Sequence, residues 1–246
     1  MKIALLGYGK MGKKIESLAS LMGGEVVVKI DSQSTEKDWE EVQKVDVCID
    51  FSHPEAILEN IKKAASYQKP IVVGTTGWKT HLSEVKTLVE KNKIGLIYAA
   101  NFSIGMNLFM HMVAQASKLL DSYSNYDVSL SETHHQGKVD KPSGTAYLIG
   151  DEVLKNMTRK KTLKTDSTNI EVDEIAIYSE RIGNVFGTHS LCFNSHEDQI
   201  TLTHKAHDRS SWAIGALKAA SWIQDKKGVY TISDMLKDEK PLVNSI

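Results

Sequence analysis

Residues 2–12 read KIALLGYGKMG, a short apolar run that passes directly into three closely spaced glycines. The apolar run has the length of a buried strand. Gly7, Gly9 and Gly12 permit a tight turn and close approach of another backbone. An amphipathic helical pattern then continues to about Met22. The stretch therefore predicts a strand, a glycine turn and a helix in immediate succession.

A glycine turn at a helix start is typical of dinucleotide sites, because the helix N-terminus faces the pyrophosphate. Asp31 lies 19 residues after Gly12 and ends the next β-branched run, where a carboxylate accepts hydrogen bonds from an adenosine ribose. A purely structural glycine turn would explain the glycines but not Asp31. The sequence thus predicts an NAD(P) site that includes Gly7, Tyr8, Gly9, Lys10, Met11, Gly12 and Asp31.

The same acid bears on the choice between NADH and NADPH. The Asp31 carboxylate repels a 2′-phosphate, and Ser32 follows it in place of an arginine that would bind one. Lys10 or Lys13 of the glycine loop can supply that positive charge instead. We therefore expect NADH to be favoured moderately, with NADPH left open.

Further apolar runs follow the first strand, separated by helical patterns, over residues 26–30, 45–49, 71–73 and 94–98. Strands that are apolar throughout and alternate with helices form parallel sheets with crossover connections. Ligands of such sheets bind beyond the carboxyl ends of the strands. Each such segment taken alone could be an ordinary turn. Three successive strand ends carry one, however, which favours further cofactor contacts there. The residues are Phe51, Gly74, Thr75, Thr76, Ala99, Ala100, Asn101 and Phe102.

The pattern changes after Asn101. A long helix is expected from Ser103, followed by alternating strands at residues 126–133, 172–179, 185–193 and 199–205 that are typical of a mixed or antiparallel sheet. A helix is expected from Pro142 to about Met157, and residues 159–169 are expected to be a mobile polar loop. A last helix is expected at residues 210–224. The fold class is therefore α/β, with a parallel-sheet domain and an α+β domain with a mixed sheet.

Residues 132–146 read ETHHQGKVDKPSGTA and concentrate proton carriers beside a helix start. The backbone amides of Gly144 and Thr145 would point outward at the positive end of the helix dipole, which suits a carboxylate. His134, His135 and Lys138 leave a strand end just upstream. Adjacent histidines on a strand face opposite sides, so the two should have different roles. The stretch predicts an anionic substrate and a proton donor.

Two other chemistries fit less well. A metal site would need chelating spacing, but the sequence has no His-Glu-x-x-His helix and no paired cysteines, and adjacent histidines do not easily bind one ion. A nucleophilic serine would need a Gly-x-Ser-x-Gly elbow, which is missing. We therefore expect no metal.

Composition excludes further classes. A net charge of −1 with dispersed Lys and Arg argues against a nucleic-acid or membrane surface. Cys48 and Cys192 lie in apolar runs, as expected of buried thiols in a reducing compartment. No apolar run is long enough for a signal core or a membrane span. We expect a cytoplasmic protein.

With these residues assembled, the chain resembles the 4-hydroxy-tetrahydrodipicolinate reductase (dihydrodipicolinate reductase) family over nearly its whole length. The most specific stretch is residues 132–146, which we associate with no other dehydrogenase family. The other similar stretches are GYGKMG (7–12), IDFSHPE (49–55), GTTG (74–77), AANFSIGMN (99–107), FGTHSLCF (186–193) and ITLTHKAHDR (200–209).

The resemblance implies a Rossmann domain, residues 1–101 completed by 208–246, and a substrate domain, 102–207, whose sheet builds a homotetramer. It implies NAD(P)H-dependent reduction of 4-hydroxy-tetrahydrodipicolinate to tetrahydrodipicolinate in lysine and diaminopimelate biosynthesis, by loss of water and hydride delivery from nicotinamide C4. The roles it implies are His134 as proton donor, Lys138 as second acid, His135 with the Gly144 and Thr145 amides as substrate ligands, and Arg209 as a hinge residue.

Few residues separate Asp31 from Val45, so the chain is short for the family on the adenosine side, which bears on cofactor preference. Two alternatives remain at this point. One is another two-domain NAD(P)-dependent amino-acid or aldehyde dehydrogenase, which would leave the His-His and Lys cluster without a dedicated purpose. The other is a non-catalytic NAD(P)H sensor, which should have lost proton carriers such as His134 and Lys138.

Overall fold

The computed structural model describes residues 1–165 and 167–238. Backbone contacts divide them into two compact units. Unit 1 comprises residues 1–104 and 209–238, and unit 2 comprises residues 105–208. The C-terminal segment thus returns to complete the unit formed by the first hundred residues.

Unit 1 is built on a six-stranded parallel sheet with the strand order β11-β5-β4-β3-β1-β2. Its strands are β1 (Lys2–Leu6), β2 (Glu25–Ile30), β3 (Val47–Asp50), β4 (Ile71–Val73), β5 (Gly95–Tyr98) and β11 (Gly228–Thr231). Its helices are α1 (Lys10–Ala19), α2 (Glu36–Glu40), α3 (Ile57–Ser66), α4 (Leu82–Asn92), α7 (Ser210–Ile223) and α8 (Ile232–Asp238), with short 3-10 turns η1 (Ser20–Met22), η2 (Glu41–Lys44) and η3 (Lys79–His81).

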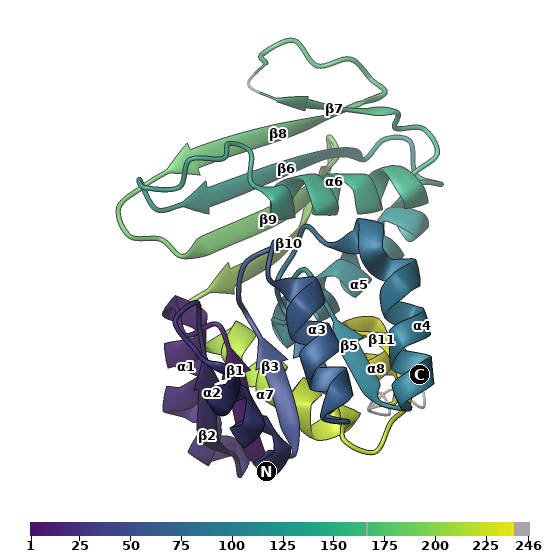
Figure 1. Cartoon of the computed structure of the whole chain (residues 1–246). Coiled ribbons are helices and arrows are strands. Elements are labelled where there is room, and N and C mark those ends of the chain that lie inside the picture. Colours follow the sequence, from purple (N-terminus) through teal and green to yellow (C-terminus); the bar gives the residue numbers. More distant parts are fainter. Residues whose placement is uncertain (166, 239–246) are drawn as a thin grey trace. The chain divides into compact units, whose positions relative to one another are not determined.

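Helices cover both faces of this sheet, as its apolar strands require. One apolar core joins alternate strand residues to α2, α3 and α4. The opposite core joins the remaining strand residues to α1, α7 and α8. In Figure 1 α3 stands beside β3, and the yellow-green C-terminal helices belong to the same unit as the purple N-terminal elements. The predicted α/β fold with a parallel sheet is confirmed.

Unit 2 has a five-stranded mixed sheet with the order β10-β9-β6-β8-β7. β6 runs antiparallel to β9 and parallel to β8, and β7 is a parallel edge strand. Two helices pack on it through one apolar core (Figure 1). The elements are α5 (Ile104–Leu120), β6 (Asp127–His134), α6 (Gly144–Asn156), β7 (Thr162–Thr165), β8 (Glu174–Arg181), β9 (Gly187–Asn194) and β10 (Gln199–Ala206).

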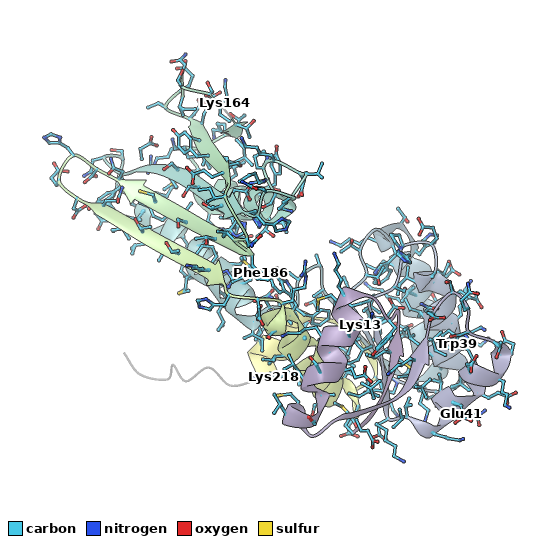
Figure 2. The ribbon with its side chains drawn as sticks, turned by 90° about the vertical axis from the view of Figure 1, so that its left-hand side faces the viewer. Lys13, Trp39, Glu41, Lys164, Phe186 and Lys218 are labelled. Carbon is cyan, nitrogen blue, oxygen red and sulfur yellow. The ribbon has the colours of Figure 1, made fainter. Side chains whose placement is uncertain are left out.

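The prediction of a loop at residues 159–169 was wrong for residues 162–165, and residue 166 lies outside the described residues. Thr162–Thr165 forms the edge strand β7, on which Figure 2 labels Lys164. The preceding Lys160 is buried, and its ammonium group lies 2.5 Å from Asp127 Oδ1 and donates to the carbonyls of Val172 and Glu174. The polar composition indicated a solvated loop, but the Lys160 ammonium group is paired with protein oxygens instead of water, so composition did not reveal the strand.

Two other features differ from expectation. The predicted helix at Pro142 begins at Gly144 instead, because Ser143 is its N-cap and accepts a hydrogen bond from the Ala146 amide. Strand β11 and helix α8, after residue 224, had no sequence prediction. In the described part of the chain, no helix combines the length and the apolar character that a membrane span requires.

Candidate active site

The glycine loop of unit 1 has the shape that a pyrophosphate cradle needs. Gly7 has φ 92°, and a Cβ there would lie 2.6 Å from the Phe51 carbonyl oxygen. A Cβ on Gly12 would lie 2.5 Å from the Gly7 carbonyl oxygen. Gly9, by contrast, faces open space and is the N-cap of α1 without a side-chain hydrogen bond. Because Gly9 has no side chain to cap the helix, the first backbone amides of α1 can face an anion.

The other residues of this loop lie at its edges. Lys10 is the first residue of α1 and is exposed, whereas Met11 is half-buried. Tyr8 hydrogen bonds through its hydroxyl to Glu16 and packs its ring under the Lys29 ammonium group, 4.5 Å from the centroid. Its side chain is therefore held along α1 by neighbouring charges.

Asp31 is exposed just beyond β2, where the sequence placed it. Its Oδ1 accepts hydrogen bonds from the Gln33 amide at 2.9 Å and from the Ser34 hydroxyl at 3.4 Å. The Asp31 amide in turn donates to the Ser34 hydroxyl. Within the described residues, this turn holds the carboxylate through hydrogen bonds to Oδ1, which leaves Oδ2 available to sugar hydroxyls.

A buried carboxylate that sequence reasoning missed ties two strand-end loops together. Asp50 ends β3 and accepts hydrogen bonds from Ser52, Thr75 and Asn60 at 2.8, 2.6 and 2.7 Å. Burial raises the pKa of Asp50, and these hydrogen bonds oppose that rise. Its position at a strand end was visible in the sequence, but its burial was not. These hydrogen bonds fix the positions of the two loops that carry Ser52 and Thr75.

The loop of Thr75 borders a cavity of about 330 Å³. It is lined by Thr75, Thr76, Gly77, Trp78, Lys79, Thr80, Tyr98, Ala99 and Ala100. The structure thus brings together four of the predicted cofactor residues from the ends of β4 and β5. A cavity at the carboxyl ends of parallel strands is where such sheets bind ligands.

The remaining predicted residues of this group lie around Phe51. A Cβ on Gly74 would overlap the Phe51 ring at 2.2 Å, so this glycine makes room for the ring. The ring meets that of Phe102 edge-on at 6.2 Å between centroids. Phe102 itself is buried in the core, and the Asn101 side chain accepts a hydrogen bond from the Ser103 amide. Phe102 thus supports the Phe51 ring from the core, and Asn101 stabilises the turn that follows β5.

In unit 2, one row of inward-facing residues changes from apolar to polar along the sheet. Along β6 the inward positions are Val128, Leu130, Glu132 and His134, which follow the two-residue strand period. The register pairs Leu130 with Leu191 and Glu132 with His189 across β9. The row ends at a buried polar cluster, which we call the Glu-His-His cluster: Glu132, His134 and His189.

The Glu-His-His cluster is compact. His134 Nε2 lies 3.4 Å from Glu132 Oε2 and 3.4 Å from His189 Nε2. His189 Nε2 lies 3.5 Å from Glu132 Oε2. His134 Nδ1 lies 3.1 Å from the carbonyl oxygen of Phe186, the residue labelled just before β9 in Figure 2. A carbonyl only accepts, so Nδ1 carries the hydrogen and Nε2 is the nitrogen that faces Glu132 and His189.

Two groups hold Glu132 from the other side. Its Oε1 accepts hydrogen bonds from the Ser143 amide at 2.9 Å and from Arg181 at 3.0 Å. Burial alone would raise the pKa of Glu132, but its contacts with His134, His189 and Ser143 outweigh burial and hold that pKa well below its usual range. Glu132 is therefore a buried carboxylate at neutral pH.

Lys138 lies outside this cluster, in the loop that leads to α6. Its ammonium group is 2.6 Å from Asp140 Oδ1, and the other Asp140 oxygen accepts from the Gly144 amide at 3.4 Å. The ammonium group holds the pKa of Asp140 below its usual range. An internal carboxylate thus already binds the lysine and the helix amide that the sequence assigned to a substrate carboxylate.

The structure divides the predicted residues of unit 2 into two groups. Lys138 and Gly144 meet through Asp140, with Thr145 half-buried in the first turn of α6. His134 instead faces the interior, and the half-buried His135 follows it at the end of β6. A Cβ on Gly187 would lie 2.8 Å from His134 Cε1, so this glycine leaves room for the imidazole.

Sequence reasoning gave no role to Glu132, His189 or Arg181. Glu132 stands two residues before His134 and therefore on the same strand face. His189 follows the same two-residue period as Leu191 and Phe193. Alternation alone could have marked both as inward-facing polar residues. Their pairing depends on the β6–β9 register, which the sequence did not reveal.

Comparison with known proteins agrees with these observations. Models of the dihydrodipicolinate reductase family match the chain twice, the N-terminal domain over residues 1–102 and the C-terminal domain over residues 105–236. A 4-hydroxy-tetrahydrodipicolinate reductase of Christiangramia forsetii is 37% identical over 238 residues, covering 97% of this chain and 98% of its own. One from Rickettsia bellii is 36% identical over 234 residues, covering 94% and 92%.

Solved structures show the same fold. A dipicolinate-bound dihydrodipicolinate reductase from Paenisporosarcina sp. TG-14 has a TM-score of 0.79 at 24% identity, covering 94% of this chain and 97% of its own. An amine dehydrogenase from Mycobacterium smegmatis has a TM-score of 0.59 at 9% identity, covering 94% and 95%. The fold is thus shared with other dehydrogenases, and the sequence matches decide between them. The chain belongs to the dihydrodipicolinate reductase family, the NAD(P)H-dependent 4-hydroxy-tetrahydrodipicolinate reductases of lysine and diaminopimelate biosynthesis.

Proposed function

We propose that unit 2 carries the proton chemistry and the substrate carboxylates for reduction of 4-hydroxy-tetrahydrodipicolinate to tetrahydrodipicolinate. The observation that supports this most strongly is the stretch 132–146, which runs from a polar strand end to an uncrowded helix N-terminus. Water leaves the substrate first, and a hydride and a proton then add across the unsaturated bond. When bound, NAD(P)H supplies the hydride from C4 of its nicotinamide.

We assign the cofactor to unit 1. The open space at Gly9 and the uncapped start of α1 fit a pyrophosphate, and the free edge of Asp31 fits a ribose. The cavity beside Thr75 and Ala99 fits the nicotinamide end. Asp50 holds the wall of that cavity in place through Thr75.

His134 is our proton donor. The Phe186 carbonyl fixes the hydrogen on Nδ1, so the transferable proton resides on Nε2. Glu132 supplies a negative charge 3.4 Å from that nitrogen, which compensates the added proton in a buried setting. Lys138 is our second acid, and its positive charge stabilises the electron-rich ring that forms as hydride arrives.

The substrate carboxylates are assigned to His135, Lys138 and the amides of Gly144 and Thr145. The Asp140 carboxylate supports this, because it already occupies the Lys138 ammonium group and the Gly144 amide. A substrate carboxylate would take over both contacts from Asp140. The dipicolinate in the Paenisporosarcina enzyme is a ligand of the same dicarboxylate class.

Replacing Lys138 by Met should weaken binding of pyridine-2,6-dicarboxylate about 10–100-fold, since a charge-assisted hydrogen bond contributes about 1.5–3 kcal/mol. Lys141→Met is the matched control, because Lys141 is exposed and lies in the same loop. Isothermal titration of both variants measures the effect. Equal affinities for the two variants would remove Lys138 from the dicarboxylate site.

The cofactor preference should follow Asp31. We expect kcat/KM for NADH to exceed that for NADPH, or the two to agree within about tenfold, because the exposed carboxylate repels a 2′-phosphate. Asp31→Ser should then shift the ratio toward NADPH. A strong NADPH preference in the unmodified protein would show that Lys10, Lys13 or the short segment after Asp31 outweighs the acid.

We also propose a cytoplasmic homotetramer assembled through the sheet of unit 2. Support comes from outward-facing positions of that sheet, where Ser190 and Thr203 hydrogen bond across strands at 2.9 Å and Tyr178 is exposed. We retain Arg209 as a hinge residue. It is the N-cap of α7 and the first residue of the segment that returns to unit 1.

A further inference from the structure

Three potential metal ligands converge inside unit 2. The Glu-His-His cluster presents one carboxylate oxygen and two imidazole nitrogens that all lie within 4.8 Å of one another. The side chains of Glu132, His134 and His189 are 0%, 10% and 4% exposed. Among the described residues, no group donates a hydrogen bond of normal geometry to the buried Glu132 Oε2, whose neighbours are the two imidazole nitrogens at 3.4 and 3.5 Å. A buried carboxylate oxygen without a donor is costly and points to a missing positively charged ligand.

The spacing within the cluster favours a metal over hydrogen bonds. The three separations are 3.4, 3.4 and 3.5 Å. Hydrogen bonds between charged nitrogen and oxygen atoms prefer about 2.7–2.9 Å. Ligands at about 2.0–2.1 Å from a tetrahedral zinc ion are separated by about 3.3–3.4 Å, because a tetrahedron's edge is about 1.63 times its radius. The observed triangle therefore matches one face of a zinc coordination tetrahedron.

The surrounding contacts orient two of the three ligands as a metal site requires, whereas His189 Nε2 also lies 3.3 Å from the Ser143 hydroxyl oxygen. His134 Nδ1 donates to the Phe186 carbonyl, which leaves the Nε2 lone pair for an ion. Arg181 and the Ser143 amide hold Glu132 Oε1, which leaves Oε2 as the single ligand oxygen. The Arg181 charge lowers the affinity for a cation, so the site should be weaker than a structural zinc site.

We propose that Glu132, His134 and His189 form a binding site for a divalent cation of the zinc class, and that occupancy inhibits the enzyme. Two imidazoles and one carboxylate suit zinc or cobalt better than magnesium or calcium, which prefer oxygen ligands alone. Inhibition rests on the proposed function, because the ion would take the His134 nitrogen that carries the transferable proton. Metal binding itself does not depend on that assignment.

The test uses the full chain without an affinity tag. Cobalt chloride is titrated into the protein and visible absorption is recorded, after which zinc chloride is added to displace the cobalt. We expect saturation at one equivalent with the absorption of four-coordinate cobalt. His189→Gln should lower the cobalt affinity by at least about tenfold. His196→Gln is the matched control, because His196 is exposed in the turn between β9 and β10 and should leave the affinity unchanged.

Should His189→Gln not fold, a crystal of the unmodified protein grown with zinc replaces it. Anomalous scattering should then show one peak bounded by the three side chains. A titration without saturation, an unchanged affinity in His189→Gln, or a zinc peak elsewhere only would overturn the site.

Reductase turnover separates this proposal from the proposed function. Zinc should inhibit over the concentration range in which it displaces cobalt, and a chelator should restore activity. Normal turnover without metal binding overturns the site alone. Saturable binding at the three residues with unaffected turnover overturns the inhibition and removes His134 from the proton transfer.

Discussion

His134→Gln should lower kcat by about 10²–10⁴-fold and change KM much less, because a general acid acts mainly in the transition state. Glutamine is close in size to histidine and offers an amide near Glu132, so the buried row between β6 and β9 should remain packed. The loss therefore reports the missing proton rather than a collapsed core.

Steady-state kinetics with each substrate varied in turn measure this effect, and thermal unfolding of the same sample confirms the fold. His135→Gln is the neighbouring control, because its half-buried side chain is assigned to a substrate carboxylate and should raise KM rather than lower kcat. Near-normal kcat in His134→Gln would assign the proton to another group, with Lys138 the next candidate.

Glu132→Ala should destabilise unit 2 by about 3–5 kcal/mol, because removing one partner of a buried ion pair leaves the other charge uncompensated. Glu132 Oε1 binds both Arg181 and the Ser143 amide, so the substitution breaks the link between β6, β8 and the start of α6. Glu180→Ala is the control. Glu180 lies on β8 but is exposed, and its loss should change stability by no more than about 0.5 kcal/mol.

Hydrogen exchange of the β6 and β9 amides is the appropriate measurement. The four tryptophans lie in unit 1, so their fluorescence does not report on unit 2: Trp39, Trp78, Trp212 and Trp222. Equal exchange in Glu132→Ala and Glu180→Ala would show that the buried carboxylate contributes nothing to stability.

Acid should selectively remove the contribution of the Glu132 carboxylate to the stability of unit 2. The pKa of Glu132 is held below its usual range in the folded protein, mainly by its contacts with His134 and His189 acting against burial. Its contribution is therefore present above the unfolded value of about 4.3 and declines as pH falls below it. The difference between the unmodified protein and Glu132→Ala should accordingly shrink from neutral pH toward about pH 3, where hydrogen exchange checks it.

Much of unit 1 followed from local sequence. Apolar runs marked β1 to β5, and those of β1 to β4 end at a glycine or an acid, because strands buried on both faces leave a strong signal. The return of β11 to the edge beside β5 was not predicted, since its half-buried residues give no comparable signal. The network of Asp50 was also missed, because its partners Ser52, Asn60 and Thr75 come from three separate segments.

In unit 2 as well, contacts between residues from separate segments of the site were not predicted from the sequence. The stretch 132–146 indicated chemistry because it concentrates proton carriers and helix-start residues. It did not indicate that His134 would face inward toward His189, which is 55 residues away. It also did not indicate that Asp140 would occupy Lys138 and the Gly144 amide. Such pairings depend on sheet register and loop closure, which have no local signature.

The central claim is that this chain reduces 4-hydroxy-tetrahydrodipicolinate with NAD(P)H. The most direct measurement mixes the purified protein with NADH or NADPH and the product of dihydrodipicolinate synthase generated in the same cuvette, and follows nicotinamide absorbance. We predict a fall in absorbance that requires both the synthase and this chain, with tetrahydrodipicolinate as the product, and that is slowed in His134→Gln. Unchanged absorbance with either cofactor, while the protein is folded and binds NAD(P)H, would contradict the account.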